Sequence, residues 1–340
     1  MSRLKSKTPP TPARFFDTIN AYQRTAALKG AIQLDLFTAL GKTRATARVL
    51  AGRCDASERG VAILCDYLAI QGFLAKRGDR YELTADAAAF LDRRSPHYLG
   101  GTIEFLLAPT LREAFDDLAA AARKGGTVIS HSGTLSSDHP VWVKFARAMA
   151  PLMRLPAQAL ARMIALPPKR AVKVLDVAAG HGVWGIAFAQ QHRNVQVVAV
   201  DWPSVLRVAR ENARAAGVES RYTTVAGSAF DVDHGAEFDL VLLPNFLHHF
   251  DPDTCVRLLE KLRAALVPDG RVVTVEFVPH PDRVSPPGVA AFSLTMLATT
   301  PHGNAYTFKE YQRMFRQAGF AHNQLRPLPA ALQQVIVSKR

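Results

Sequence analysis

The residues most able to do chemistry lie around two apolar segments in the stretch 172–201, which reads VKVLDVAAGHGVWGIAFAQQHRNVQVVAVD. The first segment ends at Asp176 and leads into a turn that contains Gly180 and Gly182, and the second ends at Asp201. Glycines let a backbone approach a ligand closely, and a helix begins with free N–H groups. An acid after the second strand can accept both hydroxyls of a ribose. The stretch therefore predicts a βαβ unit that binds a nucleoside-containing cofactor.

The spacing of the glycines indicates which cofactor this is. A dinucleotide fingerprint reads G-x-G-x-x-G, with a helix N-terminus facing the pyrophosphate. Here the pattern is D-x-A-x-G-x-G, with one G-x-G after Asp176. This loop resembles that of class I S-adenosylmethionine (SAM) methyltransferases, in which no diphosphate has to be held. A dinucleotide site and an ordinary strand-to-helix turn are the alternatives at this point.

A second set of reactive side chains, His248, His249 and Glu276, follows two later apolar segments. A neutral imidazole, whose pKa is ordinarily about 6.5, can remove a proton from a bound hydroxyl near neutral pH. A carboxylate on the other ring nitrogen orients such a base and stabilises its cation. We expect His248 to be a general base oriented by Glu276. A loop histidine that makes local hydrogen bonds alone is the alternative.

Aromatic side chains also follow the predicted strands. Ligands of open α/β sheets bind beyond the carboxyl ends of the strands. Trp202 follows the second strand and Phe230 follows the third, so their rings could flank an adenine. Ordinary core packing is the alternative for both residues.

Strand and helix patterns alternate from Val172 onward. The predicted strands are Val172–Val177, Val195–Val200, Tyr222–Ala226, Phe238–Pro244, Arg271–Phe277 and Gln333–Ser338. The predicted helices are Gly182–Gln190, Ser204–Ala216, Pro252–Leu266 and Thr307–Ala318. Such alternation, with strands apolar on both faces, predicts an α/β fold built on an open, mainly parallel sheet with helices on both sides.

The N-terminal part reads as a separate unit. Helical periodicity over 21–40, 46–53 and 58–72 is followed by a short hairpin over 73–84, which is a winged-helix pattern. A DNA-recognition helix exposes Arg, Lys, Asn or Gln to the bases, whereas the third helix here is mostly apolar. DNA binding is therefore disfavoured, although a winged-helix regulator remains an alternative function.

Further helices are predicted between these two parts, including a long one over 139–164 that we expect to break near Pro151 and Pro156. The pair Pro167-Pro168 then marks a boundary. We expect a flexible N-terminal arm over 1–13, a winged-helix domain over 14–96, connecting helices that line a pocket over 97–168, and a cofactor-binding catalytic domain over 169–340.

Composition narrows the class of protein. The chain has 340 residues, 48% of them hydrophobic and 21% charged, and no apolar run long enough to span a bilayer. The net charge of +13 is spread along the chain, which is typical of a solvated basic surface and does not indicate binding to nucleic acid or membrane. Three scattered cysteines favour a reducing compartment such as the cytoplasm and disfavour a disulfide framework or a zinc site. The N-terminus lacks the apolar region of a secretory signal.

Together these motifs resemble the caffeate-type small-molecule O-methyltransferases, including bacterial relatives that act on phenazines and hydroxyindoles. The resemblance extends over residues 14–338 and rests on LDVAAGHG, VDWPSV, GSAF, LPNFLHHFD, LVPDGRVVTVEF and TMLATTPHGNAYTFKEYQRMFRQAGF. It implies a Rossmann-like domain with a mainly parallel seven-stranded sheet, and an N-terminal winged-helix domain that forms a homodimer. It also implies a SAM-dependent O-methyltransferase of secondary metabolism that acts on a hydroxylated aromatic or polyketide-like molecule. S-adenosylhomocysteine (SAH) would be the second product. We expect no metal, because the strand ends carry no cluster of Asp, Glu and Asn suited to Mg²⁺.

The resemblance also assigns roles to residues. It places the base at His248 and its carboxylate at Glu276, with His249 as the other candidate for the base. The cofactor-binding positions are Asp176, Gly180, Gly182, Asp201, Trp202, Ser228, Phe230 and Asn245. The acceptor-pocket positions are Phe145, Met149, Phe292 and Met296, and soft Met side chains suit a flat aromatic ring.

The chain departs from the family pattern at three positions. Ser228 stands where an acid is common, His249 stands where the usual pair is His-Asp, and Ala305 stands where a second carboxylate often flanks the base. Some relatives bind SAM and yet catalyse decarboxylation, hydroxylation or ring closure, so a non-methylating enzyme on the same scaffold is an alternative. A NAD-dependent dehydrogenase is a further alternative.

Overall fold

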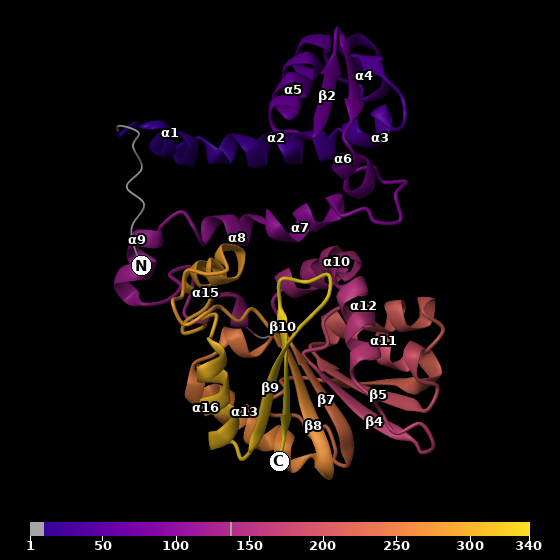
Figure 1. The fold of residues 1–340 in the computed structure, drawn as a ribbon, viewed down its shortest axis with the longest axis vertical. Coiled ribbons are helices and arrows are strands. Elements are labelled where there is room, and N and C mark those ends of the chain that lie inside the picture. Colours follow the sequence, from indigo (N-terminus) through magenta and orange to yellow (C-terminus); the bar gives the residue numbers. More distant parts are fainter. Residues whose placement is uncertain (1–9, 137) are drawn as a thin grey trace. The chain divides into compact units, whose positions relative to one another are not determined.

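The computed structural model of the protein describes residues 10–136 and 138–340, which fall into two compact units (Figure 1). The first unit ends at Ile103, and the second runs from Glu104 to Arg340. Most of the expected arm over 1–13 lies outside the described residues, and helix α1 begins at Ala13. Among the residues that the structure describes, no helix is both long and apolar enough to cross a bilayer.

The first unit combines a group of helices with a three-stranded antiparallel sheet of order β1-β3-β2. The strands are β1 (Ala45–Thr46), β2 (Leu74–Arg77) and β3 (Arg80–Leu83). The helices are α1 (Ala13–Ile19), α2 (Ala21–Gln33), α3 (Leu36–Leu40), α4 (Ala47–Arg53), α5 (Glu58–Ile70), α6 (Ala85–Phe90) and the short 3-10 helix η1 (Gly100–Thr102). The predicted hairpin is present as β2 and β3.

The core of this unit explains the apolar composition of α5. Val61, Cys65 and Leu68 recur at the spacing of one helix face and are at most 1% exposed. They join a cluster that includes Leu36 and Phe37. The apolar residues of α5, which disfavour DNA recognition, are therefore explained by the burial of one face of this helix in the core.

The second unit is built on a seven-stranded sheet of order β6-β5-β4-β7-β8-β10-β9. Its strands are β4 (Val172–Val177), β5 (Val195–Asp201), β6 (Tyr222–Ala226), β7 (Phe238–Pro244), β8 (Leu266–Glu276), β9 (His322–Pro327) and β10 (Gln334–Lys339). The first five strands in this order are parallel, whereas β10 runs antiparallel to both of its neighbours. The sheet is thus mainly parallel, as predicted.

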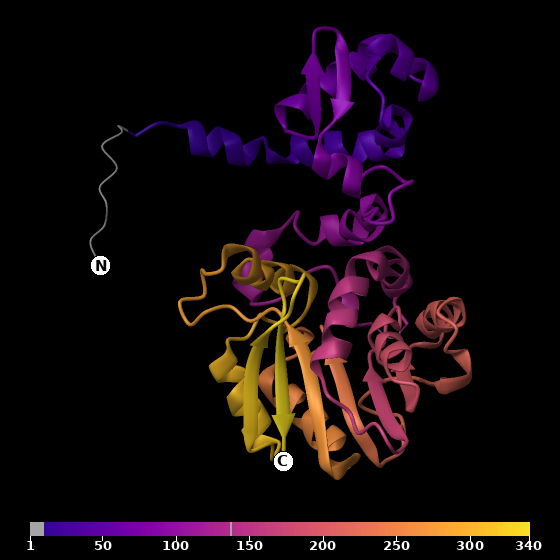
Figure 2. The ribbon, with the colours of Figure 1, turned by 45° about the vertical axis from the view of Figure 1, so that its right-hand side comes forward.

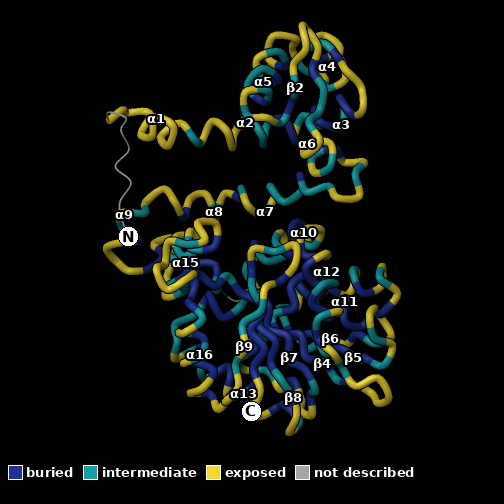
Figure 3. Tube along the Cα trace, viewed as in Figure 1, coloured by how far each residue is buried: buried dark blue, intermediate teal, exposed yellow. Residues whose placement is uncertain are grey.

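Helices cover both faces of this sheet, and the strands alternate between two cores. Val172 and Val174 of β4 pack in one cluster with α10, α11 and α12, whereas Leu175 and Val177 pack in the other with α13 and α16 (Figures 1 and 2). Figure 3 shows the central strands of the sheet, such as β7, as almost continuously buried. The helices of this unit, with the short 3-10 helices, are α7 (Ile103–Leu106), α8 (Pro109–Glu113), α9 (Leu118–Lys124), η2 (Gly133–Leu135), α10 (Val141–Met163), α11 (Val183–Gln191), α12 (Pro203–Ala215), η3 (Glu219–Arg221), η4 (Leu247–His249), α13 (Pro252–Ala264), α14 (Pro287–Ala290), α15 (Phe292–Thr299) and α16 (Phe308–Gln317).

Several elements differ from the sequence prediction. The segment 21–40 forms two helices, α2 and α3, and β8 begins at Leu266, where a helix was predicted to end. Helix α10 continues through Pro151 and Pro156, because packing of buried Met153, Ala157 and Leu160 against the sheet domain outweighs the hydrogen bonds that proline removes. Strand β9 reads HNQLRP and was not predicted, since it is a partly exposed edge strand with one apolar side chain, Leu325, and lacks a buried apolar face.

The turn after β4 has a left-handed backbone at three alternate residues. Gly180 and Gly182 have φ of 58° and 74°, and Ala178 has φ of 51° although it carries a Cβ. Gly185 is required for a different reason. A Cβ at this position would lie 2.8 Å from both Asp176 Oδ2 and Val197 Cγ1, so helix α11 can begin against the sheet only if residue 185 has no side chain.

We predict opposite effects of two exchanges between glycine and alanine, one in this turn and one in helix α11, which follows it. Gly185→Ala should lower the free energy of unfolding by about 1–3 kcal/mol, because the new methyl group overpacks the α11–sheet contact. Ala178→Gly should raise it by about 0.5–1 kcal/mol, because glycine relieves the left-handed strain but loses more backbone entropy. Denaturant unfolding curves of the two variants and the wild type provide the measurement. A Gly185→Ala midpoint equal to that of the wild type would contradict this description of the turn.

Candidate active site

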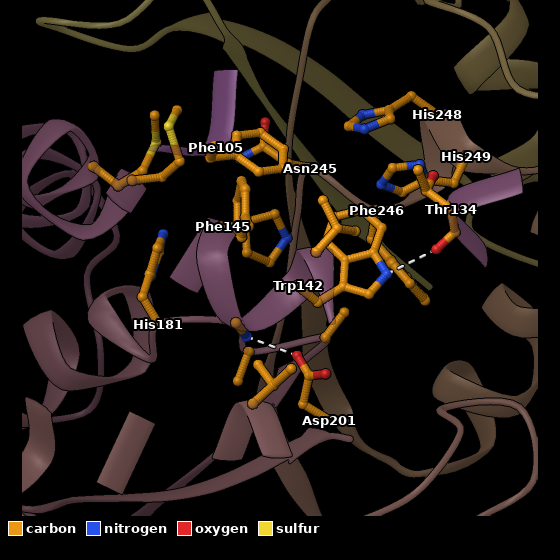
Figure 4. Close-up of a pocket in the computed structure, with 18 of the residues that line it drawn as sticks. Phe105, Thr134, Trp142, Phe145, His181, Asp201, Asn245, Phe246, His248 and His249 are labelled. Atoms are coloured by element: carbon orange, nitrogen blue, oxygen red, sulfur yellow. Dashed lines mark hydrogen bonds between the residues drawn. The ribbon is translucent and has the colours of Figure 1, made fainter. Parts of the chain in front are cut away.

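A cavity of ≈1160 Å³ lies in the second unit, at the carboxyl ends of the parallel strands. Pockets for a single small ligand are commonly about 300–1,000 Å³, so this cavity has room for a cofactor and a second small molecule. Its lining comes from the turns after β4, β5, β6, β7 and β8 and from helices α10 and α15. Figure 4 shows how its polar side chains lie.

The acid at the end of β5 is tied to the glycine turn. Asp201 Oδ2 accepts the backbone N–H of Gly180 at 2.8 Å (Figure 4). Its Oδ1 accepts the backbone N–H of Trp202 at 2.7 Å. Asp201 lines the cavity. Burial raises its pKa to about 6, although the two N–H donors act in the opposite direction. The carboxylate is therefore held in a fixed position, where it can accept hydroxyl groups of a ligand.

Two of the residues expected to contact a cofactor lie behind this turn and do not line the cavity. Asp176 is fully buried, and its Oδ2 accepts the N–H of Gly185 at 2.9 Å. Its Oδ1 has no hydrogen-bond partner within the described ranges, and burial raises its pKa well above the usual range. A Cβ on Gly182 would lie 2.6 Å from Tyr222 Oη. The arrangement gives both residues a part in shaping the turn.

The other expected cofactor positions all line the cavity. Trp202, Ser228 and Phe230 follow β5 and β6, and Ser228 Oγ accepts the N–H of Phe230 at 3.2 Å. Asn245 follows β7 with φ of 52°, and its side-chain oxygen accepts a hydrogen bond from Gln333 at 3.2 Å. Aromatic rings, a hydroxyl and an amide thus line the same cavity as Asp201.

His248 and Glu276 form a buried pair at the ends of β7 and β8. His248 Nδ1 lies 2.5 Å from Glu276 Oε2, and the two side chains are 4% and 0% exposed. Glu276 Oε1 accepts the backbone N–H groups of Phe246 at 3.0 Å and of His248 at 3.3 Å. Nδ1 therefore carries the proton that faces the carboxylate. Nε2 makes no hydrogen bond to a described residue, and the His248 side chain lines the cavity.

The loop after α15 supports the same histidine from its other side. Asn304 donates its backbone N–H to the His248 carbonyl at 2.8 Å, and a Cβ on Gly303 would lie 2.4 Å from that oxygen. Ala305, where a second carboxylate is common in the family, is fully buried. In this chain the second support of His248 is a close backbone contact.

His249 differs from its neighbour in its partners. Its ring lies 4.3 Å from the His248 ring, centre to centre, and meets the edge of Trp142 at 5.4 Å. Its Nδ1 is buried and has no hydrogen-bond partner in the described part of the chain. Burial and the neighbouring His248 hold the pKa of His249 well below its usual range. His249 thus lines the cavity as a neutral ring without a carboxylate.

The four expected acceptor-pocket residues lie on the cavity wall. Phe145 and Met149 come from α10, and Phe292 and Met296 come from α15. The Phe292 ring meets the His248 ring edge-on at 4.8 Å, which places this aromatic wall directly against the histidine.

Several cavity residues were missed by the sequence analysis. Trp142 precedes Phe145 by three positions on the same helix, so the helical spacing was an available signal. Phe277 follows Glu276 and stacks on Phe292 at 4.1 Å. His181 lies between the two glycines of the turn, and no spacing rule singles out a residue there. Within the described ranges, no group of three or more His, Cys, Asp or Glu side chains is arranged to hold a metal ion.

The arrangement fits a ligand that contains a nucleoside. Asp201 can accept ribose hydroxyls, and Trp202 and Phe230 present rings beside it. Gly180 brings the backbone to the cavity wall, where a Cβ would come within 3.4 Å of the Phe145 ring. A histidine with a free ring nitrogen stands at the far side of the same cavity.

Comparisons with known proteins agree with this geometry. The O-methyltransferase domain family matches residues 115–321, and the O-methyltransferase dimerisation domain family matches residues 16–93. The 3-hydroxy-5-methyl-1-naphthoate 3-O-methyltransferase of Streptomyces sahachiroi is 30% identical over 92% of this chain and 92% of its own. The tetracenomycin polyketide synthesis 8-O-methyltransferase of Streptomyces glaucescens is 27% identical over 91% of each chain.

A solved structure from Nostoc punctiforme, assigned as an O-methyltransferase, is 55% identical to this chain. It covers 98% of this chain and 100% of its own, with a TM-score of 0.95. The O-methyltransferase domain match covers more than half of the chain, and the fold and the relatives agree with it. The protein belongs to the family of SAM-dependent O-methyltransferases.

Proposed function

We propose that this enzyme methylates a hydroxyl group of an aromatic or polyketide-like small molecule, with His248 as the general base and Glu276 as the group that orients it. The buried His248–Glu276 pair at the cavity wall is the observation that carries the proposal. Relatives that act on a hydroxynaphthoate and in tetracenomycin polyketide synthesis support the acceptor class.

The cofactor half of the cavity is assigned from its donors and rings. Asp201 would accept the ribose hydroxyls, and Trp202 and Phe230 would flank the adenine. Ser228 and Asn245, which also line the cavity, would supply further polar contacts. SAM, when bound there, supplies an electrophilic methyl group. The role of the protein is to hold that group facing the acceptor oxygen in a site that excludes water.

The base works through a fixed tautomer. Glu276 holds the proton of His248 on Nδ1, so the lone pair of Nε2 is free to accept the proton of the acceptor hydroxyl. A phenol has a pKa of about 10, so the proton leaves as the oxygen attacks the methyl group. The imidazolium that forms is stabilised by the same buried carboxylate. His249 lacks such a partner, which makes it the weaker candidate for the base.

The acceptor half of the cavity favours a flat, apolar molecule. Phe145 and Phe292 present aromatic rings, and Met149 and Met296 present flexible thioethers that adapt to a ring face. Because Phe292 touches His248, a ring bound against it would bring its hydroxyl close to Nε2.

We also propose that two copies of the chain associate through the N-terminal unit. The dimerisation-domain match covers residues 16–93. Large apolar side chains are exposed on α1 and α2, namely Phe15, Phe16, Ile19 and Tyr22. Several large exposed apolar side chains within eight residues are consistent with a protein–protein interface.

The two adjacent histidines should respond differently to substitution. We expect His248→Ala to lower kcat for a hydroxynaphthoate acceptor by about 10²–10⁴-fold, because the proton acceptor is lost. The Kd for SAH should stay within about 3-fold of the wild-type value. The matched control, His249→Phe, keeps an aromatic ring at the neighbouring position and should retain most of kcat. Greater loss in His249→Phe than in His248→Ala would reverse the assignment of the base.

Glu276 and His248 should behave as one catalytic unit. Glu276→Gln retains the size of the side chain but removes its charge, so we expect kcat to fall by about 10²–10⁴-fold. Adding His248→Ala to this variant should cost little more, because the partners of a single unit are strongly non-additive. Kinetics of the single and double variants provide the test, and additive losses would show that the two side chains act separately.

Asp201 should make cofactor binding depend on pH. Its pKa of about 6 in the free protein means that the carboxylate is ionised above this pH. Ribose hydroxyls donate to the ionised form, so SAH affinity should be highest above about pH 6 and fall as the carboxylate protonates below it. Asp201→Asn should bind about 10–100-fold more weakly and lose this dependence. Calorimetric titrations of both proteins across this range are the measurement, and identical pH profiles would contradict the assignment.

A further inference from the structure

Lys261 is a partly buried cation that the proposed mechanism does not use. It lies in helix α13 and is not part of the cavity lining. Its Nζ donates to three main-chain carbonyls of one loop, those of Ala229 at 3.2 Å, Phe230 at 2.8 Å and Val232 at 2.7 Å. An ammonium group has three N–H donors and no acceptor. All of these donors are used within the protein, so Lys261 has none left for a ligand.

The loop that Lys261 binds follows β6 and carries two of the proposed adenine positions. Ser228 and Phe230 both line the cavity. Phe230 donates its backbone N–H to the Ser228 side chain at 3.2 Å, and Asp231 and Val232 donate theirs to the Ser228 carbonyl at 3.0 Å. The N–H groups of the loop are thus directed back to Ser228, and three of its carbonyls face Lys261. No other group in the described ranges donates to these three carbonyls.

Helix α13 gives this cation a fixed support. The side chains of Leu258, Leu259 and Leu262 are buried and pack in one core cluster with strands of the sheet. The helix begins at Pro252, directly after the turn that carries the proposed base, His248. One packed helix therefore connects the turn of the proposed base with the loop of the proposed adenine site.

The position of the Phe230 ring depends on the path of this loop. The ring meets Phe250 edge-on at 5.1 Å and lies 6.3 Å from Phe246, centroid to centroid. A ring that flanks a ligand adds most affinity when it is already in place, because ordering a loop on binding costs free energy. Hydrogen bonds from a charged donor are stronger than those between neutral groups. The three bonds from Lys261 therefore order the main chain of Phe230 before a ligand binds.

We propose that Lys261 is a positioning residue for the adenosine part of SAM. It fixes the carbonyls of the loop after β6 and so holds Ser228 and Phe230 in place, without touching the cofactor. This proposal rests on the proposed placement of the adenine beside Phe230. A residue outside the cavity then sets the affinity for the nucleoside, while proton removal by His248 does not depend on it.

Removal of the ammonium group tests this role. Lys261→Met keeps an unbranched side chain but removes all three donors. It should raise the KM for SAM and the Kd values of SAH and 5′-methylthioadenosine by about 10-fold, because these ligands share the adenosine group. The kcat at saturating SAM and the KM for a hydroxynaphthoate acceptor should stay within about 2-fold of the wild-type values. A lysine that served stability alone would shift the unfolding midpoint and leave the KM for SAM unchanged.

Further variants complete the test. Lys261→Arg retains the charge and several N–H donors, so its KM for SAM should lie within about 3-fold of the wild-type value. Lys261→Gln, which has fewer donors and no charge, is measured beside Lys261→Met in case the latter does not fold, and should weaken SAH by at least about 3-fold. Lys173→Met is the matched control, because Lys173 Nζ donates at 2.8 Å to the carbonyl of Ala236, which follows the same strand but does not line the cavity. It should leave the affinities for SAM and SAH unchanged.

A variant of Phe230 separates this proposal from the placement of the adenine. Phe230→Ala removes the ring itself and should weaken SAH by at least about 10-fold. If it does so while Lys261→Met and Lys261→Gln bind SAH as the wild type does, the positioning role is wrong and the placement stands. A loss of kcat at an unchanged KM for SAM in the Lys261 variants would also overturn the role. If Phe230→Ala leaves SAH affinity unchanged, the adenine lies elsewhere and this proposal fails with its placement.

Discussion

The buried carboxylate of Glu276 is the constraint on which the proposed chemistry depends. A carboxylate with no exposed surface is stable in a folded protein when donors surround it. Pro244 of β7 pairs with Val275 of β8, so the carboxyl ends of these two parallel strands lie side by side. The turn after β7 therefore passes over Glu276. That turn delivers the N–H groups of Phe246 and His248, and the His248 ring delivers a third donor. Two backbone N–H groups of the turn and the N–H of the His248 ring therefore all donate to the same carboxylate.

The opposite side of the cavity is organised by hydrogen bonds to the glycine turn. Asp201 accepts the N–H of Gly180, and buried Asp176 accepts the N–H of Gly185, so two acids hold the turn from two sides. Asp176 therefore has a structural role although it does not line the cavity, because its hydrogen bond to Gly185 fixes the start of α11. The two halves of the site are thus built in the same way, with carboxylates positioning backbone and rings.

Much of the fold could be predicted from the sequence because its strands are apolar on both faces. The alternation of strands and helices after Val172 identified the α/β class and every parallel strand of the sheet. Strand β9 was missed since an edge strand needs no such pattern, and the continuity of α10 was missed since tertiary packing outweighs the local effect of proline.

The site residues that could be predicted from the sequence are those that follow a predicted strand and belong to a recognisable motif. His248, Glu276 and Asp201 follow strands, and the structure brings them to one cavity. Asp176 has the same signal but lies behind the turn, because the direction of a side chain at a strand end depends on packing that the sequence does not display. His181 gave no signal at all, since its place on the cavity wall comes from the path of the turn, which only coordinates reveal.

The central claim is that Glu276 holds the proton of His248 on Nδ1 and leaves Nε2 free to take a proton from the acceptor. Imidazole ¹⁵N NMR of the SAH-bound protein, with the signals of His248 assigned by substitution, measures this tautomer directly. The account predicts a protonated Nδ1 and an unprotonated Nε2 when the ring is neutral. A neutral ring with its proton on Nε2 would contradict it, because that nitrogen could not then act as the base.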